Sequence, residues 1–493
     1  MPVITILPAN IHTETAEGTV LLQALRDAGV FLDAPCGGQG RCGKCTVIID
    51  GEEKRACRIT VGADLAVTIP ERGGLSVLSE GIGAQARFDP VQKGYLLAVD
   101  IGTTSVVCFL LDRIDGSVFA SASALNAQAA FGADVISRIR AALAGELERE
   151  RDVIREQLTE LIGEVCREAG VGPGEIGVVT AVGNPAMQQL FLGISPENLA
   201  TIPFAPVLTR AETVPCRDIL PVCENAQLLI VPDISGYIGA DTMACVLSTG
   251  IHEAGELTLL VDIGTNGEMV LGNRERLVAC SAAAGPALEG ACIRFGMRGT
   301  DGAIDHVRAE GGKLRCSVIG GGTARGICGS GLIDAAAVLL ENGTLNRRGR
   351  ITAGEERDGQ RIAALTETVY LTQEDIRQLQ MAKGAICAGI RLMAGHIGAE
   401  VNDIRRVLLA GAFGSYMDPD SACRIGLLPE ELRGRVAAVG NAAGSGARRL
   451  ACDREALAMT RKLREKIEFL ELASLPEFSG TFARSMTFRE AEK

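Results

Sequence analysis

Four cysteines near the start of the chain have the spacing of ligands to an iron–sulfur centre. Cys36, Cys42 and Cys45 lie in the glycine-rich run PCGGQGRCGKC (residues 35–45), and Cys57 follows it. Four thiolates satisfy two tetrahedral irons, and hydrogen bonds to the sulfurs tune the potential of such a cluster. The glycines of the run allow positive φ and would bring backbone N–H groups close to sulfur. The pattern predicts a [2Fe–2S] cluster held by these four cysteines, and therefore an electron carrier.

Zinc and disulfide bonds are the alternatives for these cysteines. Structural zinc usually takes its ligands from two close pairs, whereas here three cysteines form an uneven triplet and the fourth stands apart. The remaining cysteines lie scattered, mostly in apolar segments such as those around Cys108 and Cys245. Such usage is typical of a reduced, intracellular protein rather than a disulfide framework. The spacing favours the [2Fe–2S] cluster and leaves zinc as the main alternative.

The strands and the helix expected around these cysteines have the order of a β-grasp unit. Residues 3–7 and about 11–15 have the pattern of strands, and residues 19–28 place apolar side chains at helical spacing, with Thr19 as the N-cap and Gly29 as the stop. After the cysteine run, residues 46–51 turn back into a strand that carries Cys57, and residues 67–69 close the unit. This order of elements is similar to that of ferredoxins, most specifically at the cysteine loop.

A second pattern occurs twice in the chain, at a separation typical of domains. Residues 95–107 (YLLAVDIGTTSVV) have the pattern of a buried strand ending in Asp100, a glycine turn with hydroxyl side chains and a returning strand. Residues 257–270 (LTLLVDIGTNGEMV) repeat this pattern around Asp262. Such a turn offers backbone N–H and hydroxyl donors to phosphate oxygens, and its carboxylate can hold Mg²⁺ through water or position an attacking water. Two facing turns could bind a triphosphate from both sides. The alternative interpretation is that both segments are ordinary hairpins in α/β sheets.

This organisation resembles the actin/sugar-kinase/Hsp70 superfamily, whose two α/β lobes, ribonuclease H-like in fold, clamp Mg-ATP between two phosphate loops. The resemblance implies that Asp100 and Asp262 manage Mg²⁺ and water. The nucleotide contacts that it implies come from Gly102, Thr103, Thr104, Gly264, Thr265, Asn266, Gly267, Gly411 and Gly414. Residues 178–185 and 439–446 resemble the two connecting segments of that superfamily, and residues 407–414 resemble its adenosine motif.

One further helix is marked by a capping box. Thr372 and Asp375 have the spacing that opens a helix, and Lys383 lies within the helical stretch that follows. For Lys383 the two alternatives are a solvated surface position and a contact with nucleotide.

Length and composition restrict the classes of function. The chain has 493 residues, of which 47% are hydrophobic, so it can form more than one core. The net charge of −12, without a basic stripe, argues against nucleic-acid and anionic-membrane partners. No apolar run reaches the roughly 18 residues of a membrane span, and the N-terminus lacks the layout of a signal peptide. A cytoplasmic location is expected.

The pairing of a ferredoxin unit with an actin-like ATPase is similar to the reductive activators of corrinoid-dependent enzymes. The segments that carry this resemblance lie along nearly the whole chain, at residues 34–38, 126–128, 131–138, 285–290, 326–334 and 410–416. Longer members of that family carry an extra domain between the two parts, whereas this chain has only a linker there. The fold class expected is an α+β β-grasp ferredoxin domain (residues 1–72), a linker (73–93), and a two-lobed α/β actin-like ATPase (94–256 and 257–493).

The resemblance implies ATP-dependent, one-electron return of an inactive Co(II) corrinoid protein of a methyltransferase system to Co(I). Its cofactors would be the [2Fe–2S] cluster, ATP and Mg²⁺, and its partners the corrinoid protein and a low-potential electron donor, with a homodimer favoured by the superfamily's habits. The alternatives are an ATP-driven activator of another low-potential enzyme, a redox-sensing small-molecule kinase, and a non-catalytic redox-sensing module in which ATP is structural.

Overall fold

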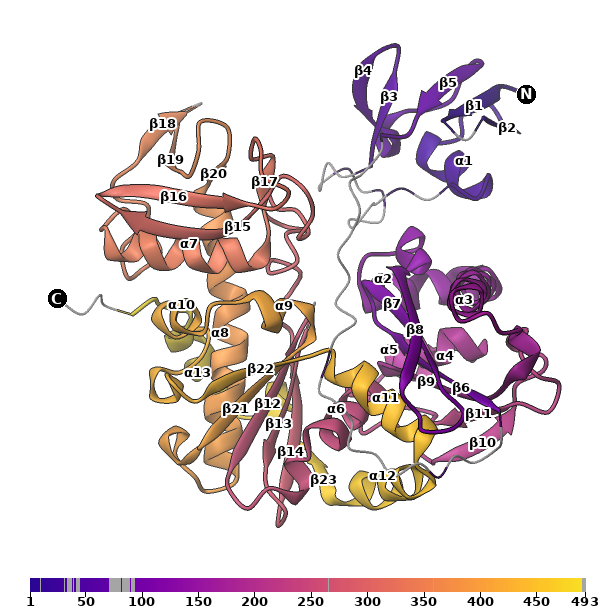
Figure 1. Ribbon diagram of the computed structural model, residues 1–493. Helices are drawn as coiled ribbons and strands as arrows, with labels where there is room; N and C mark the ends of the chain where they lie inside the picture. The colour runs from indigo at the N-terminus through magenta and orange to yellow at the C-terminus, as the bar shows by residue number, and fades with distance from the viewer. Residues whose placement is uncertain are drawn as a thin grey trace.

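The computed structural model describes residues 1–8, 10–30, 32, 38, 40, 45–70, 81, 89, 94–264, 266–357 and 359–489. These residues form a small sheet-and-helix unit at the N-terminus and two larger α/β lobes (Figure 1). In Figure 1 the N-terminal unit lies above the first lobe, and the second lobe stands opposite with the C-terminus on its outer side.

The N-terminal unit is a five-stranded sheet crossed by one helix, α1 (Leu21–Asp27). The strand order is β2-β1-β5-β3-β4, with β1 (Val3–Leu7), β2 (Ile11–Glu14), β3 (Thr46–Ile49), β4 (Glu52–Arg55) and β5 (Leu65–Thr68). Burial alternates along β1, as expected for a sheet with one covered face. The buried side chains of α1 and of the inner sheet face form one core, in the β-grasp arrangement that the sequence predicts.

Two local predictions in this unit are wrong. Thr19 does not cap the helix, because the N-cap is Val20, which makes no side-chain hydrogen bond. The backbone of Thr19 pairs instead with Val61, whose N–H donates to the Thr19 carbonyl at 2.8 Å. Cys57 lies in a single-turn 3₁₀ helix, η1 (Ala56–Arg58), rather than on a strand. The stop at Gly29 is confirmed, since Gly29 takes φ +76° just after the helix.

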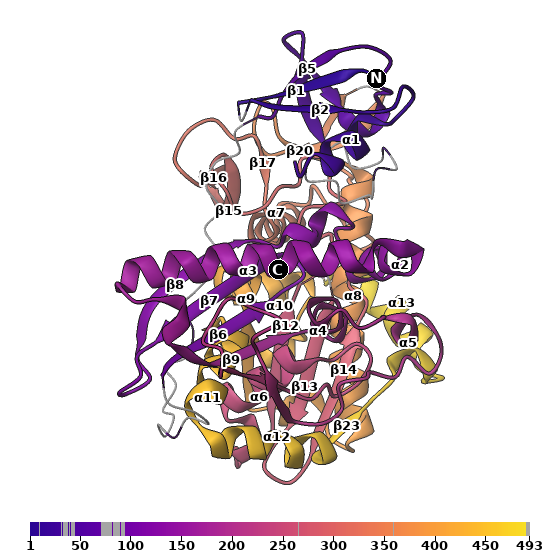
Figure 2. The ribbon, with the colours of Figure 1, turned by 90° about the vertical axis from the view of Figure 1, so that its right-hand side faces the viewer.

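The first lobe is built on a six-stranded sheet in the order β10-β11-β9-β6-β7-β8. Its strands are β6 (Tyr95–Ile101), β7 (Ser105–Leu111), β8 (Val118–Leu125), β9 (Ile176–Gly183), β10 (Glu212–Pro215) and β11 (Gln227–Ile230). Its helices are α2 (Val135–Ala141), α3 (Leu147–Ala169), α4 (Pro185–Leu192) and α5 (Glu197–Ala200). Buried residues at helical spacing on α3 pack against β7 and β8. Figure 2 shows α3 running across this face of the lobe, below the N-terminal unit.

The second lobe is built on a sheet in the order β22-β21-β12-β13-β14-β23. Its strands are β12 (Thr258–Ile263), β13 (Gly267–Gly272), β14 (Leu277–Ala282), β21 (Arg406–Ala410), β22 (Val436–Gly440) and β23 (Ile467–Phe469). Two three-stranded sheets extend the lobe. The first has the strand order β16 (Lys313–Val318), β15 (Ala303–Glu310), β17 (Gly326–Ile327). The second has the strand order β18 (Glu355–Arg357), β19 (Gln360–Ala364), β20 (Tyr370–Leu371). Its helices are α7 (Gly329–Glu341), α8 (Gln373–His396), α9 (Gly411–Tyr416), α10 (Pro419–Ile425) and α13 (Phe478–Met486).

The two D-I-G-T segments occupy equivalent places in the two sheets. In the first lobe β6 pairs antiparallel with β7 and parallel with β9. In the second lobe β12 pairs antiparallel with β13 and parallel with β21. Each D-I-G-T segment therefore ends a central strand and turns into the next one. The hairpins predicted from the repeat are confirmed.

Two helices lie between the lobes and join them. Helix α6 (Ala240–Thr249) packs against α11 (Ala442–Cys452), and α11 also packs against β6 and β9 of the first sheet. The core around these helices includes buried side chains from both large sheets. Helix α12 (Arg454–Lys466) follows α11 at the bottom of both views (Figures 1 and 2). Closing or opening of the lobes must therefore be accommodated around α6 and α11.

The capping box at Thr372 is confirmed, but both alternatives for Lys383 are wrong. The Thr372 side chain and the Asp375 carboxylate cap each other's backbone at the start of α8. Lys383 is only 1% exposed, and its Nζ donates to the carbonyls of Ser485 at 2.6 Å and Thr487 at 2.8 Å. Its ammonium also lies over the ring of Phe488. The lysine thus holds the C-terminal segment against α8, away from the nucleotide residues.

None of the helices described is both long and apolar enough to cross a membrane.

Candidate active site

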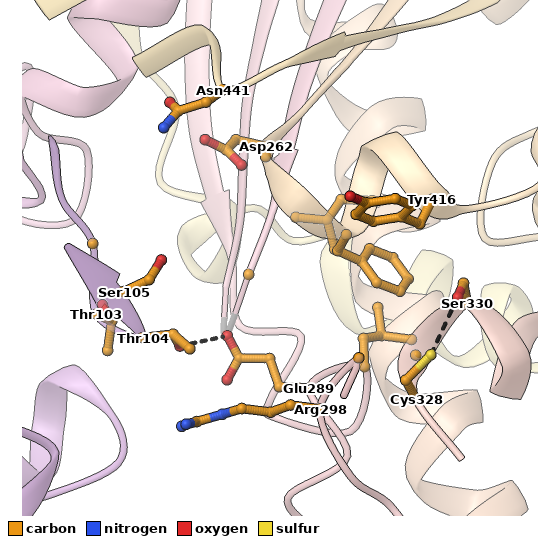
Figure 3. Close-up of a pocket in the computed structure, with 18 of the residues that line it drawn as sticks. Thr103, Thr104, Ser105, Asp262, Glu289, Arg298, Cys328, Ser330, Tyr416 and Asn441 are labelled. Atoms are coloured by element: carbon orange, nitrogen blue, oxygen red, sulfur yellow. Dashed lines mark hydrogen bonds between the residues drawn. The ribbon is translucent and has the colours of Figure 1, made fainter. Parts of the chain in front are cut away.

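A cavity of about 510 Å³ lies between the lobes, and both D-I-G-T turns line it (Figure 3). The predicted site residues that line it are Asp100, Gly102, Thr103, Thr104, Asp262, Gly264, Asn266 and Gly411. Thr265 lies outside the described residues. Gly267 and Gly414 do not line the cavity, because Gly267 faces Ile386 in the core and Gly414 packs against Leu409.

The first turn is held from behind by side chains of three neighbouring segments. The Asn126 amide donates to the Gly102 carbonyl at 2.7 Å, and the Asn184 amide donates to Thr103 Oγ1 at 3.0 Å. The buried Arg138 guanidinium donates to the Thr103 carbonyl at 2.5 Å. Because these bonds fix both the backbone and one hydroxyl, the turn can present its remaining donors to a ligand in a preset geometry.

The second turn is closed by its own backbone and by a neighbouring glycine. The Gly264 N–H donates to the Asn266 carbonyl at 2.8 Å. Gly411, at the start of α9, has φ +79°, and a Cβ there would lie 2.6 Å from Asp262 Oδ1. Only glycine fits this position, since both the left-handed backbone and the close carboxylate exclude a side chain.

The cavity holds a cluster of carboxylates whose charges oppose one another. Burial and the nearby Asp241 raise the pKa of both Asp100 and Asp262 to about 7. Burial raises the pKa of Asp241 to about 6, and burial together with Asp241 and Asp262 raises that of Glu268 well above its usual value. Such a cluster favours a bound cation, which would stabilise the charged forms.

The donor set fits Mg²⁺ held mainly through water and phosphate. Among the residues that the structure describes, no three His, Cys, Asp or Glu side chains converge closely enough to hold a metal ion directly. Mg²⁺ commonly keeps several waters and takes one or two carboxylates plus substrate phosphates. Asp100 and Asp262, which end the two facing strands, would supply those carboxylates.

A further part of the cavity lining is apolar. It consists of Leu288, Met297, Ile319, Phe413 and Tyr416, and Gly329 and Ser330 at the start of α7 also line the cavity. Figure 3 shows Tyr416 and Ser330 on the opposite side of the cavity from Thr103 and Thr104. An aromatic and aliphatic lining suits a flat heterocycle, whereas the two turns suit phosphates. The cavity therefore has the polarity of a nucleotide site.

Two of the four predicted cluster ligands lie within the described residues. Cys45 is fully buried, and Cys57 is half-buried. The pKa of Cys45 is raised, mainly because the thiol is buried, and the Cys57 thiol interacts directly with it. Cys36 and Cys42 lie outside the described residues. Gly38 has φ +86°, and a Cβ there would lie 3.9 Å from Cys57 Cβ, so the backbone passes close to this thiol as a cluster loop requires. The thiols present fit a [2Fe–2S] cluster.

Several residues of the site were not predicted as functional from the sequence. Asp241, Glu268, Glu289, Arg298 and Asn441 line the cavity, and Asn126, Arg138 and Asn184 support the first turn. Asn126, Arg138 and Glu289 lie in segments that resemble the activator family. The resemblance to that family could therefore have indicated these three residues. No repeated motif in the sequence indicates what chemistry each of them performs.

Comparisons with known proteins agree with this geometry. Residues 4–66 match the family described as a 2Fe-2S iron-sulfur cluster binding domain, residues 95–254 match the RACo middle region, and residues 256–493 match the C-terminal ASKHA domain of RACo. The corrinoid activation enzyme RamQ of Eubacterium limosum is 30% identical, with 96% of this chain and 97% of that protein covered. A reductase of the Co(II) methylated amine-specific corrinoid protein from Methanosarcina barkeri is 26% identical, with 80% of this chain and 77% of the reductase covered.

A solved structure gives the same assignment. A reductive activator for a corrinoid, iron-sulfur protein superposes with a TM-score of 0.73 at 29% identity, with 100% of this chain and 99% of that chain covered. The fold and site define an ASKHA ATPase with a [2Fe–2S] ferredoxin domain at its N-terminus. This chain belongs to the family of corrinoid reductive activators that includes RamQ. The predicted family, fold class and cofactors are confirmed.

Proposed function

We propose that this protein uses ATP to return a Co(II) corrinoid protein to Co(I), one electron at a time. The observation that carries the proposal is one chain that combines a ferredoxin domain with an interlobe cavity lined by both D-I-G-T turns. The names of the full-length relatives, a corrinoid activation enzyme and a Co(II) corrinoid protein reductase, support the same substrate class.

The nucleotide would bind with its base at the apolar part of the lining and its phosphates between the turns. Thr103 and Thr104 would donate to phosphate oxygens from the first lobe, and Gly264 and Asn266 from the second. Asp100 and Asp262 would orient the water shell of Mg²⁺, which supplies positive charge against the phosphates when bound. Because the two turns belong to different lobes, a nucleotide that contacts both favours a closed arrangement around α6 and α11.

ATP is needed because Co(I) is strongly reducing. For a one-electron step, each 59 mV of unfavourable potential costs about 1.4 kcal/mol. A ligand shifts a conformational equilibrium only by its differential affinity for the two states. The closed, ATP-bound state would therefore bind the Co(II) partner in a form that accepts an electron more readily. ATP hydrolysis would then reopen the lobes and release the Co(I) partner.

The cysteine domain completes the reductase. Cys36, Cys42, Cys45 and Cys57 would hold a [2Fe–2S] cluster, which supplies single electrons when bound. A low-potential electron donor would reduce the cluster. The protein would act as a homodimer.

The test is a visible-light titration under anaerobic conditions. Cluster-loaded protein, a low-potential reductant and a Co(II) corrinoid protein are mixed with and without Mg-ATP, and the Co(I) absorption is followed. We expect Co(I) to accumulate only with Mg-ATP. Unchanged Co(II) under all conditions would overturn the proposal, and a phosphorylated small molecule would favour a kinase instead.

A further inference from the structure

A carboxylate from neither phosphate turn lies in the gap between them. Glu289 follows β14 in the second lobe, and its Oε1 accepts a hydrogen bond from Thr104 Oγ1 of the first lobe at 3.2 Å. A Cβ placed on Gly264 of the second turn would lie 3.8 Å from the same oxygen. In Figure 3 the Glu289 carboxylate points towards Thr104. Oε1 is thus close to both turns, where a terminal phosphate would lie.

Two arginines lie near this carboxylate. Burial lowers the pKa of Arg138 to about 10, whereas Glu289 and other acids act to raise it, so Glu289 lies within electrostatic range of the guanidinium behind the first turn. Arg298 lines the cavity beside Glu289 and extends towards the same turn (Figure 3). Among the described residues, no carboxylate lies within ion-pair distance of Arg298.

The backbone keeps Glu289 and Arg298 together. A Cβ on Gly290 would lie 2.6 Å from the backbone nitrogen of Met297, so the segments that precede Arg298 and follow Glu289 are in close contact. Ala287 and Leu288 are buried in the core of the second lobe and fix the start of this segment. These contacts hold the backbone of Glu289 beside the position where a terminal phosphate would lie.

We propose that Glu289 is a catalytic residue of ATP hydrolysis, a step that rests on the proposed function. When the terminal phosphate takes the Thr104 hydroxyl, the Glu289 carboxylate turns to the water beside that phosphate and accepts its proton. The water oxygen forms a bond to the γ-phosphorus, the bond from that phosphorus to the bridging oxygen breaks, and ADP leaves with the electron pair. The proton then passes from Glu289 to solvent. Arg298 offsets the negative charge that a carboxylate adds beside a phosphate.

A structural latch is the competing role for the same contact. If the Thr104–Glu289 bond only held the lobes in this arrangement, its loss would change the affinity for ATP and leave the rate of hydrolysis intact. A general base has the opposite signature, because its loss lowers kcat and leaves ATP binding nearly unchanged. The two roles therefore separate in a comparison of kcat with binding.

The experiment uses the full-length, cluster-loaded protein. ATP hydrolysis is measured across pH for the wild type, E289Q and E289A, and binding of a non-hydrolysable ATP analogue is measured in parallel. We expect E289Q to lower kcat by about 10²- to 10⁴-fold with near-normal analogue binding. Formate, a small carboxylate, should partly restore hydrolysis to E289A. The matched control is E275Q, at an exposed position in the β13–β14 turn.

The outcomes distinguish this role from the function as a whole. A wild-type protein that hydrolyses ATP and an E289Q variant with unchanged kcat would overturn the role of Glu289 alone. E289Q with tighter analogue binding and normal kcat would assign the latch instead. A wild-type protein without any ATP hydrolysis would overturn both the role and the proposed function.

Discussion

The acidic side chains of the cavity are the residues whose charge state depends most on what is bound. Asp100, Asp241, Asp262 and Glu268 all have raised pKa values, because burial disfavours their charged forms and Asp241 lies near the other three. In the absence of a cation, protonation relieves this repulsion. Mg²⁺ relieves it differently, by stabilising the carboxylates in their charged forms.

The nucleotide-free protein should lose stability as the pH rises from about 4 to about 7. Asp100 and Asp262 titrate at about 7 in the folded protein, above their ordinary value of 3.8, so the folded state holds more protons across this window. The free energy of unfolding therefore falls as the pH rises. Linkage sets an upper limit of about 4 kcal/mol for each group, so we expect a fall of a few kcal/mol, measured by thermal unfolding at a series of pH values.

Mg-ATP should reverse this trend, because the carboxylates hold the cation best when they are charged. D262N should flatten the pH dependence, whereas D218N, at an exposed position, should not. A Tm that rises with pH in the nucleotide-free wild type would contradict the raised pKa values of these carboxylates.

One substitution should remove the iron–sulfur cluster and leave nucleotide binding intact. C57S removes one of the four predicted thiolates, so we expect loss of iron and of Co(II) reduction while Mg-ATP binding is retained. Iron content, visible absorption and nucleotide binding measure the three properties. The control is C292S, because Cys292 is exposed and lies far from the cysteine run in sequence. Full iron content in C57S would remove Cys57 from the ligand set.

At the residue scale, the sequence indicates residues whose chemistry recurs at a fixed spacing. The D-I-G-T residues could be found because the pattern occurs twice, and the cavity brings the two turns together. Arg138 and Glu289 each form a hydrogen bond with the first turn from a distant part of the chain, and no residue spacing in the sequence predicts these contacts. Lys383 is the opposite case, since its position after a capping box gave no sign that carbonyls of residues 485 and 487 would bury it.

At the scale of elements, α6 and α11 are the parts that both lobes share. Their close approach depends on Gly446, where a Cβ would lie 2.6 Å from the Cα of Ala244 on the facing helix. The hairpins and the capped helix were predictable from local patterns. The position of α6 and α11 between the sheets was not, because it depends on contacts between segments about 200 residues apart in the chain.

Substitution of Gly446 by alanine should therefore push these two helices apart. Overpacking of this kind costs about 1–3 kcal/mol, and we expect G446A to lower the urea midpoint and to weaken the response of the lobes to ATP. The matched control is G163A on α3, where a Cβ would meet nothing within 4 Å. That change should stabilise the protein by about 0.5–1 kcal/mol, since alanine is the better helix former. Equal stabilities for the two variants would contradict the close helix contact.

At the scale of the whole molecule, the cysteine domain and the ATPase meet through a polar contact. Asp27 of α1 and Arg149 of α3 form an ion pair at 3.3 Å, and both side chains are about half exposed. Such a pair contributes about 0–1 kcal/mol, too little to fix one domain on the other. The chain itself supplies the stronger link, because a covalent connection keeps the domain at a high effective concentration near its own lobes.

Electron transfer and ATP hydrolysis should therefore have to lie on the same chain. C57S lacks a thiolate of the cysteine run and D262N lacks a carboxylate of the ATP cavity, so each variant alone should fail to reduce the Co(II) corrinoid protein. If each cysteine domain serves the ATPase to which it is joined, a mixture of the two variants should also fail, even at high protein concentration. The measurement is Co(I) formation in the mixture with Mg-ATP and reductant, with each variant mixed with wild type as the control. Restored reduction in the mixture would instead show that the cysteine domain of one chain serves the ATPase of another, and the weak Asp27–Arg149 contact would then be no guide to the working arrangement.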